Sequence, residues 1–272
     1  MPVTILGIPF DANSSYLKGA AQAPPLIREA LFSESSNLYS EMGVDLSASG
    51  NLFDAGDLQL GRTPREDFQE IETSAVALLQ QKTPVVFLGG DHSITFPLVK
   101  ACHRTYPELS IVHFDAHPDL YPEYEGNRYS HACPFARIME NQLARGLVQI
   151  GIRSLNAVQQ EQIQRYRVKV FPMKYGVPGV AGRPGFKLEG PVYLSFDIDA
   201  LDPAFVPGIS HWEPGGMSVR DALGCLQALD IRIVAADIVE FNPIRDNSGR
   251  TAMVCAKLLK EIAAKMLSAP NS

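Results

Sequence analysis

The sequence predicts a three-layer α-β-α fold, in which a mostly parallel central sheet lies between two layers of helices. Short apolar runs alternate with helix-like segments along the whole chain, and this alternation is typical of parallel strands joined by right-handed crossovers. Several of the runs are apolar at consecutive positions, as strands covered on both faces require. With 272 residues, of which 46% are hydrophobic and 20% charged, the chain can form one large domain, and we expect a single domain over residues 1–272.

The expected strands and helices follow from the spacing of apolar residues and from the capping, Gly and Pro residues that begin or interrupt each segment. Ser218 begins a helix-like segment and Asp221 follows three residues later, which is an imperfect capping box. Residues 174–189 are rich in Gly and Pro, and we interpret them as a long surface loop because the alternation continues beyond them. The predicted strands are 3–8, 85–88, 110–114, 147–150, 168–171, 192–196 and 233–238, and the predicted helices are 25–32, 65–81, 94–105, 134–143, 157–166, 219–229 and 251–266.

Composition excludes several classes of protein. A net charge of −6 argues against a nucleic-acid-binding protein, and no apolar stretch reaches the ~18 residues of a membrane span. The four cysteines are scattered without a C-x-x-C pair, which argues against a disulfide framework or a zinc ribbon. The first residues lead into a strand without the basic and apolar regions of a signal peptide. We therefore expect a cytoplasmic protein with reduced thiols.

Three strand ends carry unusual polar residues, and ligands of parallel sheets bind beyond such ends. The first is Gly89-Gly90-Asp91-His92-Ser93, where two glycines allow a sharp turn off the strand. His92 alone is weak evidence, since a single histidine after a strand is more often a hydrogen-bonded structural residue.

The other two strand ends present carboxylates in pairs. In an extended chain Asp115, His117 and Asp119 share one face, so we expect them to converge on one point. Asp197 and Asp199 share a face in the same way, whereas Asp202 before a proline indicates a turn. Burying neighbouring carboxylates costs several kcal/mol each unless a cation compensates. The alternative is a chance pattern in a solvated loop.

Together these residues provide four carboxylates and two imidazoles. Such oxygen-rich ligands favour Mn²⁺, and Co²⁺ or Ni²⁺ are also compatible. Four negative charges would balance two divalent cations, and two ions ~3.5–4 Å apart can lower the pKa of a shared water. The pattern therefore predicts a hydrolytic site with two metal ions, held by His92, Asp115, His117, Asp119, Asp197 and Asp199.

The three motifs, G-G-D-H-S, D-A-H-P-D and S-F-D-I-D-A-L-D-P, resemble the three signatures of the ureohydrolases, the arginase and agmatinase family. Their order and spacing match, and the resemblance covers nearly the whole chain. A narrower likeness to plant arginases lies in 113–121, 125–127, 129–132, 135–140, 207–213 and 251–254. The resemblance implies the arginase-like α/β fold, a small guanidino substrate and a homo-oligomer, either a trimer or a hexamer. From the net charge and the lack of a long apolar stretch, we expect no nucleic-acid and no membrane partner.

The resemblance also implies a role for each site residue. His92, Asp115, Asp119 and Asp197 would hold one Mn²⁺, while Asp115, His117, Asp197 and Asp199 would hold the other. Asp115 and Asp197 would bridge the two ions, and Asp199 would also accept a hydrogen bond from the attacking hydroxide. His131 matches the catalytic histidine that passes a proton to the leaving amine, and Glu240 matches the glutamate that pairs with the guanidinium.

One departure from the family's common pattern concerns the substrate. Where most agmatinases and animal arginases have G-T-G-T-P, this chain has Gly208-Ile209-Ser210-His211-Trp212, so His211 replaces a threonine near the guanidinium. The plant likeness favours L-arginine, whose α-carboxylate could contact Asn127, Arg128 or Ser130. Agmatine, or another guanidino acid or formimino compound, is the alternative, and a metal-binding assembly subunit without activity is a remote one.

Overall fold

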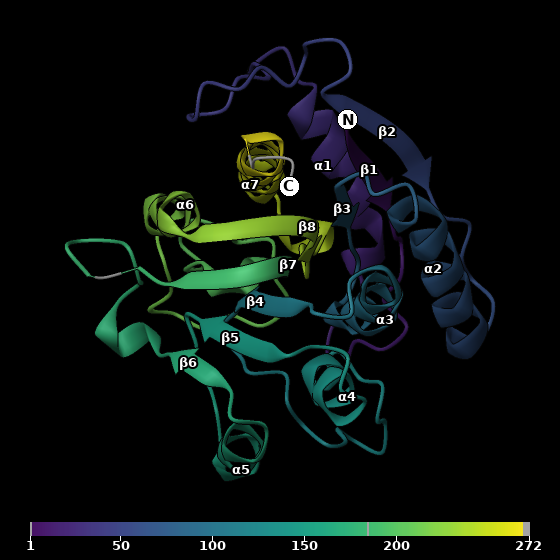
Figure 1. Ribbon diagram of the computed structural model, residues 1–272, viewed down its shortest axis with the longest axis vertical. Helices are drawn as coiled ribbons and strands as arrows, with labels where there is room; N and C mark the ends of the chain where they lie inside the picture. The colour runs from purple at the N-terminus through teal and green to yellow at the C-terminus, as the bar shows by residue number, and fades with distance from the viewer. Residues whose placement is uncertain (1, 184, 269–272) are drawn as a thin grey trace.

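An eight-stranded sheet forms the centre of the computed structural model, which describes residues 2–183 and 185–268 (Figure 1). Its order is β2-β1-β3-β8-β7-β4-β5-β6, and every ladder between these strands is parallel. The strands are β1 (Val3–Gly7), β2 (Leu52–Asp57), β3 (Val85–Leu88), β4 (Ser110–Phe114), β5 (Gly146–Ile150), β6 (Lys169–Phe171), β7 (Lys187–Asp197) and β8 (Asp230–Val239).

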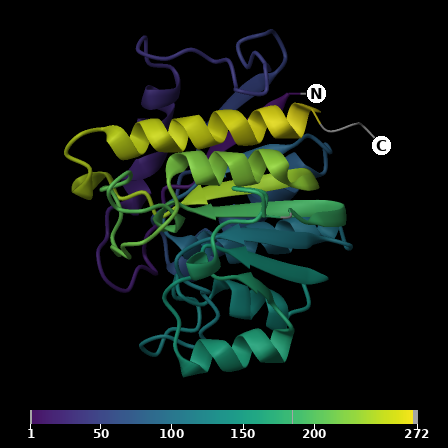
Figure 2. The same cartoon turned by 90° about the vertical axis from the view of Figure 1, so that its left-hand side faces the viewer.

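Helices cover both faces of the sheet, which confirms the predicted three-layer fold (Figures 1 and 2). One layer contains α1 (Ala23–Leu31), α6 (Val219–Ala228) and α7 (Arg250–Ser268). The other contains α2 (Pro64–Leu79), α3 (Thr95–Thr105), α4 (Pro134–Glu140) and α5 (Ala157–Tyr166). In the described part of the chain, no helix combines the length and the apolar character needed to cross a membrane.

Strand β3 illustrates why the strands are apolar at consecutive positions. Val86 and Leu88 belong to the core under α1, α6 and α7, whereas Val85 and Phe87 belong to the core under α2, α3 and α4. Successive side chains of a strand point to opposite faces, so a strand between two helical layers buries both sets.

The seven predicted strands are all present, with ends that differ by up to five residues, but β2 was not predicted. Its sequence, Leu-Phe-Asp-Ala-Gly-Asp, is mostly exposed because β2 lies at the edge of the sheet. The prediction for 174–189 was also partly wrong, because β7 already begins at Lys187, with Lys187 opposite Asp230. That extension projects beyond the apolar part of the strand, so no buried pattern marks it.

The predicted helices are present as well, with ends that differ by up to three residues. The Ser218–Asp221 capping box forms in full, since the Ser218 hydroxyl oxygen accepts from the Asp221 N–H and the Asp221 carboxylate accepts from the Ser218 N–H. More important for function, β8 lies between β3 and β7, and β4 lies beside β7. The carboxyl ends of these four strands therefore meet at the centre of one sheet edge.

Candidate active site

The turn after β3 brings His92 to this edge. Gly90 lies against the backbone of Phe10, and a Cβ at position 90 would be 1.7 Å from the Phe10 carbonyl oxygen. Asp91 then caps the short helix η2 (His92–Ile94), because its Oδ1 accepts a hydrogen bond from the Ser93 N–H at 3.0 Å. The close approach requires glycine, and the cap fixes the direction in which the His92 side chain leaves the backbone.

His92 faces three carboxylates in the first candidate metal group. Its Nδ1 lies 3.2 Å from Asp115 Oδ2, 3.0 Å from Asp119 Oδ2 and 3.1 Å from Asp197 Oδ2. One ligand atom from each of the four residues lies within 4.8 Å of all the others. The Nδ1 atom is buried and has no hydrogen-bond partner, so the group offers a nitrogen and three oxygens to a cation.

The second candidate group combines Asp115, His117 and Asp199. His117 Nδ1 lies 3.0 Å from Asp199 Oδ2 and 3.4 Å from Asp115 Oδ1. Asp115 thus turns one oxygen toward each group. The prediction that Asp115, His117 and Asp119 converge on one point was wrong, because β4 ends at Phe114 and Asp119 adopts a φ of 49°, so the segment is not extended throughout.

Asp197 lies in the first group only. Its Oδ1 accepts a hydrogen bond from the Asp199 N–H at 2.7 Å, which caps the short helix η4 (Ile198–Ala200). The structure thus brings all six predicted ligands into two adjoining groups with Asp115 in common, and the bridging role of Asp197 stays a prediction.

Without cations, the two groups bind protons strongly. Burial raises the pKa of Asp197 well above its usual range, and Asp199 and Asp115 raise it further. Burial lowers the pKa of His92, but the neighbouring carboxylates of Asp115, Asp119 and Asp197 raise it more, so the net shift is upward. Divalent cations would relieve the repulsion between these carboxylates, and the donor set therefore fits the two ions that the sequence predicts.

Beside the metal groups, His131 lies between two partners. Its Nδ1 is 2.8 Å from Glu240 Oε1, and its Nε2 is 2.8 Å from the hydroxyl of Ser15. The His211 ring lies 5.4 Å from the His131 ring, 6.1 Å from that of His117 and 5.5 Å from that of Tyr16. His211 thus lies beside His131 and beside His117 of the second metal group.

The three other expected substrate contacts differ in their placement. The Asn127 amide donates to Asn13 Oδ1 at 3.2 Å, next to the loop that carries Ser15. Ser130 is only 2% exposed, so its placement does not support contact with a ligand. Arg128 forms an exposed two-fold ion pair with Glu140, with both distances at 2.9 Å, and is therefore not aimed at the metal groups.

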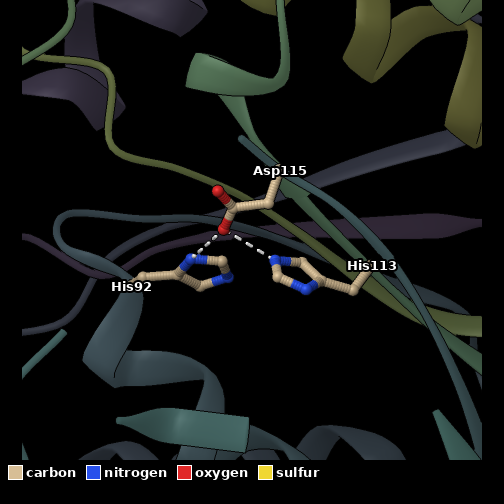
Figure 3. A group of neighbouring side chains, drawn as sticks. All are labelled: His92, His113 and Asp115. Carbon is tan, nitrogen blue, oxygen red and sulfur yellow. Dashed lines mark hydrogen bonds and ion pairs between the residues drawn. The ribbon is translucent and has the colours of Figure 1, made fainter. Parts of the chain in front are cut away.

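A polar row that was not predicted crosses the sheet below the metal groups. Asp237, Ser195, His113 and Gln149 are in register on β8, β7, β4 and β5, and all four are fully buried. Figure 3 shows His113 beside His92, with both rings directed at Asp115. His113 precedes Asp115 by two residues and Ser195 precedes Asp197 by two, so the alternation used for the ligands could have identified both.

The β8 end of this row supports His92. His92 Nε2 lies 2.9 Å from the Ser195 hydroxyl, which donates to Asp237 Oδ1 at 2.7 Å. The hydroxyls of Tyr193 and Thr95 both donate to Asp237 Oδ2 at 2.7 Å. Three hydroxyl donors thus satisfy a carboxylate that would otherwise be costly to bury.

Comparison with known proteins decides the family. The sequence model of the Arginase family matches residues 1–264. The chain belongs to the arginase family. Arginase 1, mitochondrial, of Arabidopsis thaliana is 45% identical over 97% of this chain and 80% of its own length. The agmatinase of Bacillus subtilis (strain 168) is 32% identical over 95% of this chain and 89% of its own length.

Solved structures agree with this assignment. The arginase from Medicago truncatula superimposes with a TM-score of 0.88 at 42% identity, covering 97% of this chain and 87% of that one. Like other members of the arginase family, the chain is a hydrolase that acts on the carbon–nitrogen bonds of linear amidines.

The expectation of a cytoplasmic location was wrong. The relatives from Arabidopsis thaliana, Oryza sativa and Medicago truncatula carry the word mitochondrial in their names. The expectation depended partly on scattered, free cysteines. Free thiols indicate only a reducing compartment, and the cytoplasm is not the only such compartment.

Proposed function

We propose that this enzyme binds two Mn²⁺ ions and hydrolyses L-arginine to ornithine and urea. The observation that carries the proposal is His92 Nδ1, a buried atom without a hydrogen-bond partner that faces three carboxylate oxygens at 3.0–3.2 Å. A buried nitrogen in this setting needs a proton or a cation. The oxygen-rich ligand set supports Mn²⁺, and Co²⁺ or Ni²⁺ would suit the same atoms.

We assign the ligands as two sets that share Asp115 and Asp197. His92, Asp115, Asp119 and Asp197 would hold one ion, and Asp115, His117 and Asp199 the other, with Asp197 as a second bridging ligand. When bound, the ions would supply a water of lowered pKa and positive charge for the transition state. Asp199 would in addition orient the attacking water, because its carboxylate lies beside both His117 and Asp115.

Glu240 would pair with the guanidinium of the substrate, and His131 would transfer a proton. Glu240 Oε1 accepts from both His131 Nδ1 and the His92 N–H at 2.8 Å, so the carboxylate is held in place by two donors. Its second oxygen would face the guanidinium. His131 would pass a proton to the leaving amine, with Ser15 on its far side.

L-Arginine is favoured because the plant relatives named arginases are 43–45% identical to this chain, against 32% and 34% for the agmatinases of Bacillus subtilis and Halalkalibacterium halodurans. We assign Asn127 and His211 to substrate contact, and Ser130 as a weaker candidate because of its burial. Agmatine is the second candidate substrate. One observation favours it: Arg128 is paired with Glu140 and so offers no positive charge to an α-carboxylate. By resemblance we also propose a homo-oligomer, a trimer or a hexamer, which light scattering would test.

The direct test is urea release by the Mn²⁺-loaded protein from L-arginine, agmatine, guanidinobutyrate and guanidine. We expect the highest kcat/KM for L-arginine, and no urea from any substrate with metal bound would refute the proposal. Asp199→Asn should abolish turnover. The matched control is Asp230→Asn, because Asp230 is exposed at the opposite end of β8, and its loss should leave activity unchanged.

A further inference from the structure

His113 and Gln149 lie below Asp115 on neighbouring strands and touch no solvent. They are opposite each other in the register of β4 and β5, and both side chains are fully buried. One nitrogen or oxygen atom from each of His92, His113 and Asp115 lies within 4.8 Å of the other two, so His113 is also near enough to share a metal ion. Its hydrogen bonds decide whether it binds a metal or does something else.

The amide of Gln149 determines which ring nitrogen of His113 carries a hydrogen. Gln149 Nε2 donates to the Pro118 carbonyl at 2.7 Å and lies 3.0 Å from His113 Nδ1. If the Gln149 amide were turned over, its oxygen would lie against the Pro118 carbonyl oxygen. Only the orientation with Nε2 toward Pro118 places a donor against that carbonyl. Both amide hydrogens are then used, and His113 Nδ1 must accept.

The other nitrogen of His113 must therefore carry the hydrogen. His113 Nε2 lies 2.7 Å from Asp115 Oδ2 and donates to it (Figure 3). The ring is stacked on Phe135 with 4.0 Å between centroids, which holds this donor in one direction. A nitrogen that carries a hydrogen and donates it is not free to bind a metal.

We propose that His113 is a positioning residue that fixes the rotation of Asp115, with Gln149 selecting its tautomer. This inference rests on the proposed function. Asp115 Oδ2 belongs to the first group and Oδ1 faces His117 in the second, so rotation of the carboxylate would disturb both. Because Gln149 also binds the Pro118 carbonyl, one amide couples the His113 ring to the loop that carries His117 and Asp119.

The tautomer can be measured without any substitution. In metal-free protein labelled with ¹⁵N-histidine, we expect the His113 resonances to show hydrogen on Nε2 and none on Nδ1. Gln149→Leu removes the donor and should yield a mixture of tautomers. Hydrogen on Nδ1 of the unsubstituted protein would overturn the proposal.

The consequence for metal is tested by titration of Mn²⁺, followed by calorimetry and by electron paramagnetic resonance. We expect His113→Leu to weaken binding of at least one ion about 10- to 100-fold. His113→Gln, whose Nε2 can still donate toward Asp115, should recover most of the affinity, and His103→Leu on α3 serves as the control for loss of a histidine. If His113→Leu does not fold, Gln149→Leu replaces it, with a smaller loss expected.

Two failures are distinguishable. Equal Mn²⁺ affinity in the unsubstituted protein and in a folded His113→Leu or Gln149→Leu variant would overturn the role of His113 and leave the proposed function intact. If the unsubstituted protein binds no metal, the proposed function fails and this inference fails with it.

Discussion

His131 Nδ1 lies 2.8 Å from Glu240 Oε1, and this contact joins the turn after β4 to the end of β8. Burial lowers the pKa of His131, but the Glu240 carboxylate raises it more, and the result is a pKa of about 9. Burial raises the pKa of Glu240, but His131 lowers it more. The two side chains therefore form an ion pair at neutral pH. Glu240 also adopts a φ of 65°, which costs free energy in a residue with a side chain.

The first prediction concerns the stability of the metal-free protein against pH. Because the pKa of His131 is about 9 in the folded state and about 6.5 when unfolded, the contribution is complete below pH 6.5 and is lost as pH rises through 9. Its size is on the order of 3 kcal/mol. His131→Asn should therefore lower the free energy of unfolding by more at pH 6 than at pH 10. A difference that is the same at both pH values would contradict the ion pair.

The second prediction concerns protons displaced by metal. The pKa of His92 and that of Asp197 are both raised well above their usual ranges, which favours bound protons in the metal-free protein. Binding of Mn²⁺ should release at least one proton, and the affinity should fall as pH falls. Calorimetric titration in two buffers of different ionisation enthalpy measures this release. An apparent enthalpy that does not depend on the buffer would refute the release of protons. Separately, removal of bound metal by a chelator should lower the Tm of the protein, because the metal binds only the folded state.

The third prediction concerns the substrate pocket. The His211 ring lies near the rings of both His131 and Tyr16. Burial lowers the pKa of His211, and repulsion from His131 lowers it further, so His211 is neutral near pH 7. His211→Thr should change the ratio of kcat/KM for L-arginine and agmatine by about tenfold, or about 1.4 kcal/mol. His103→Thr on α3 is the matched control. An unchanged ratio would exclude His211 from substrate selection.

The fourth prediction concerns the turn after β3. A Cβ at Gly90 would meet the Phe10 carbonyl at 1.7 Å, and backbone atoms cannot move aside as a flexible side chain can. Gly90→Ala should therefore lower the free energy of unfolding by about 1–3 kcal/mol and weaken metal binding through His92. Gly146→Ala is the control, since nothing lies within 4 Å of its added Cβ. Chemical denaturation of both variants provides the comparison, and equal stability would contradict the close approach.

Most of the fold could be predicted because buried parallel strands are apolar on both faces. β3 and β4 match the predicted bounds, since each is buried along nearly its whole length. β2 could not be predicted in this way, because an edge strand with exposed Asp54 and Asp57 has no apolar pattern. The Lys187 end of β7 was not predicted for the same reason, since its first residues are mostly exposed.

The site could be predicted where alternation along one strand was enough. That alternation identified Asp115 and Asp197, and its extension by one step would have added His113 and Ser195. It could not show that Asp119 leaves the extended conformation, because this depends on a positive φ at a residue with a side chain. Nor could it place Ser15 against His131, since that contact joins loops 116 residues apart.

The order of strands also has a consequence for how the enzyme is made. β8 is the last of the eight described strands, yet it lies in the middle of the sheet and separates β3 from β7. During synthesis, a nascent chain that ends before β8 lacks the strand that lies between β3 and β7 in the native sheet. His92 and Asp197 therefore cannot reach their final separation until β8 has left the ribosome. We expect the site to form in one late step, so chains truncated before β8 should have no partial activity.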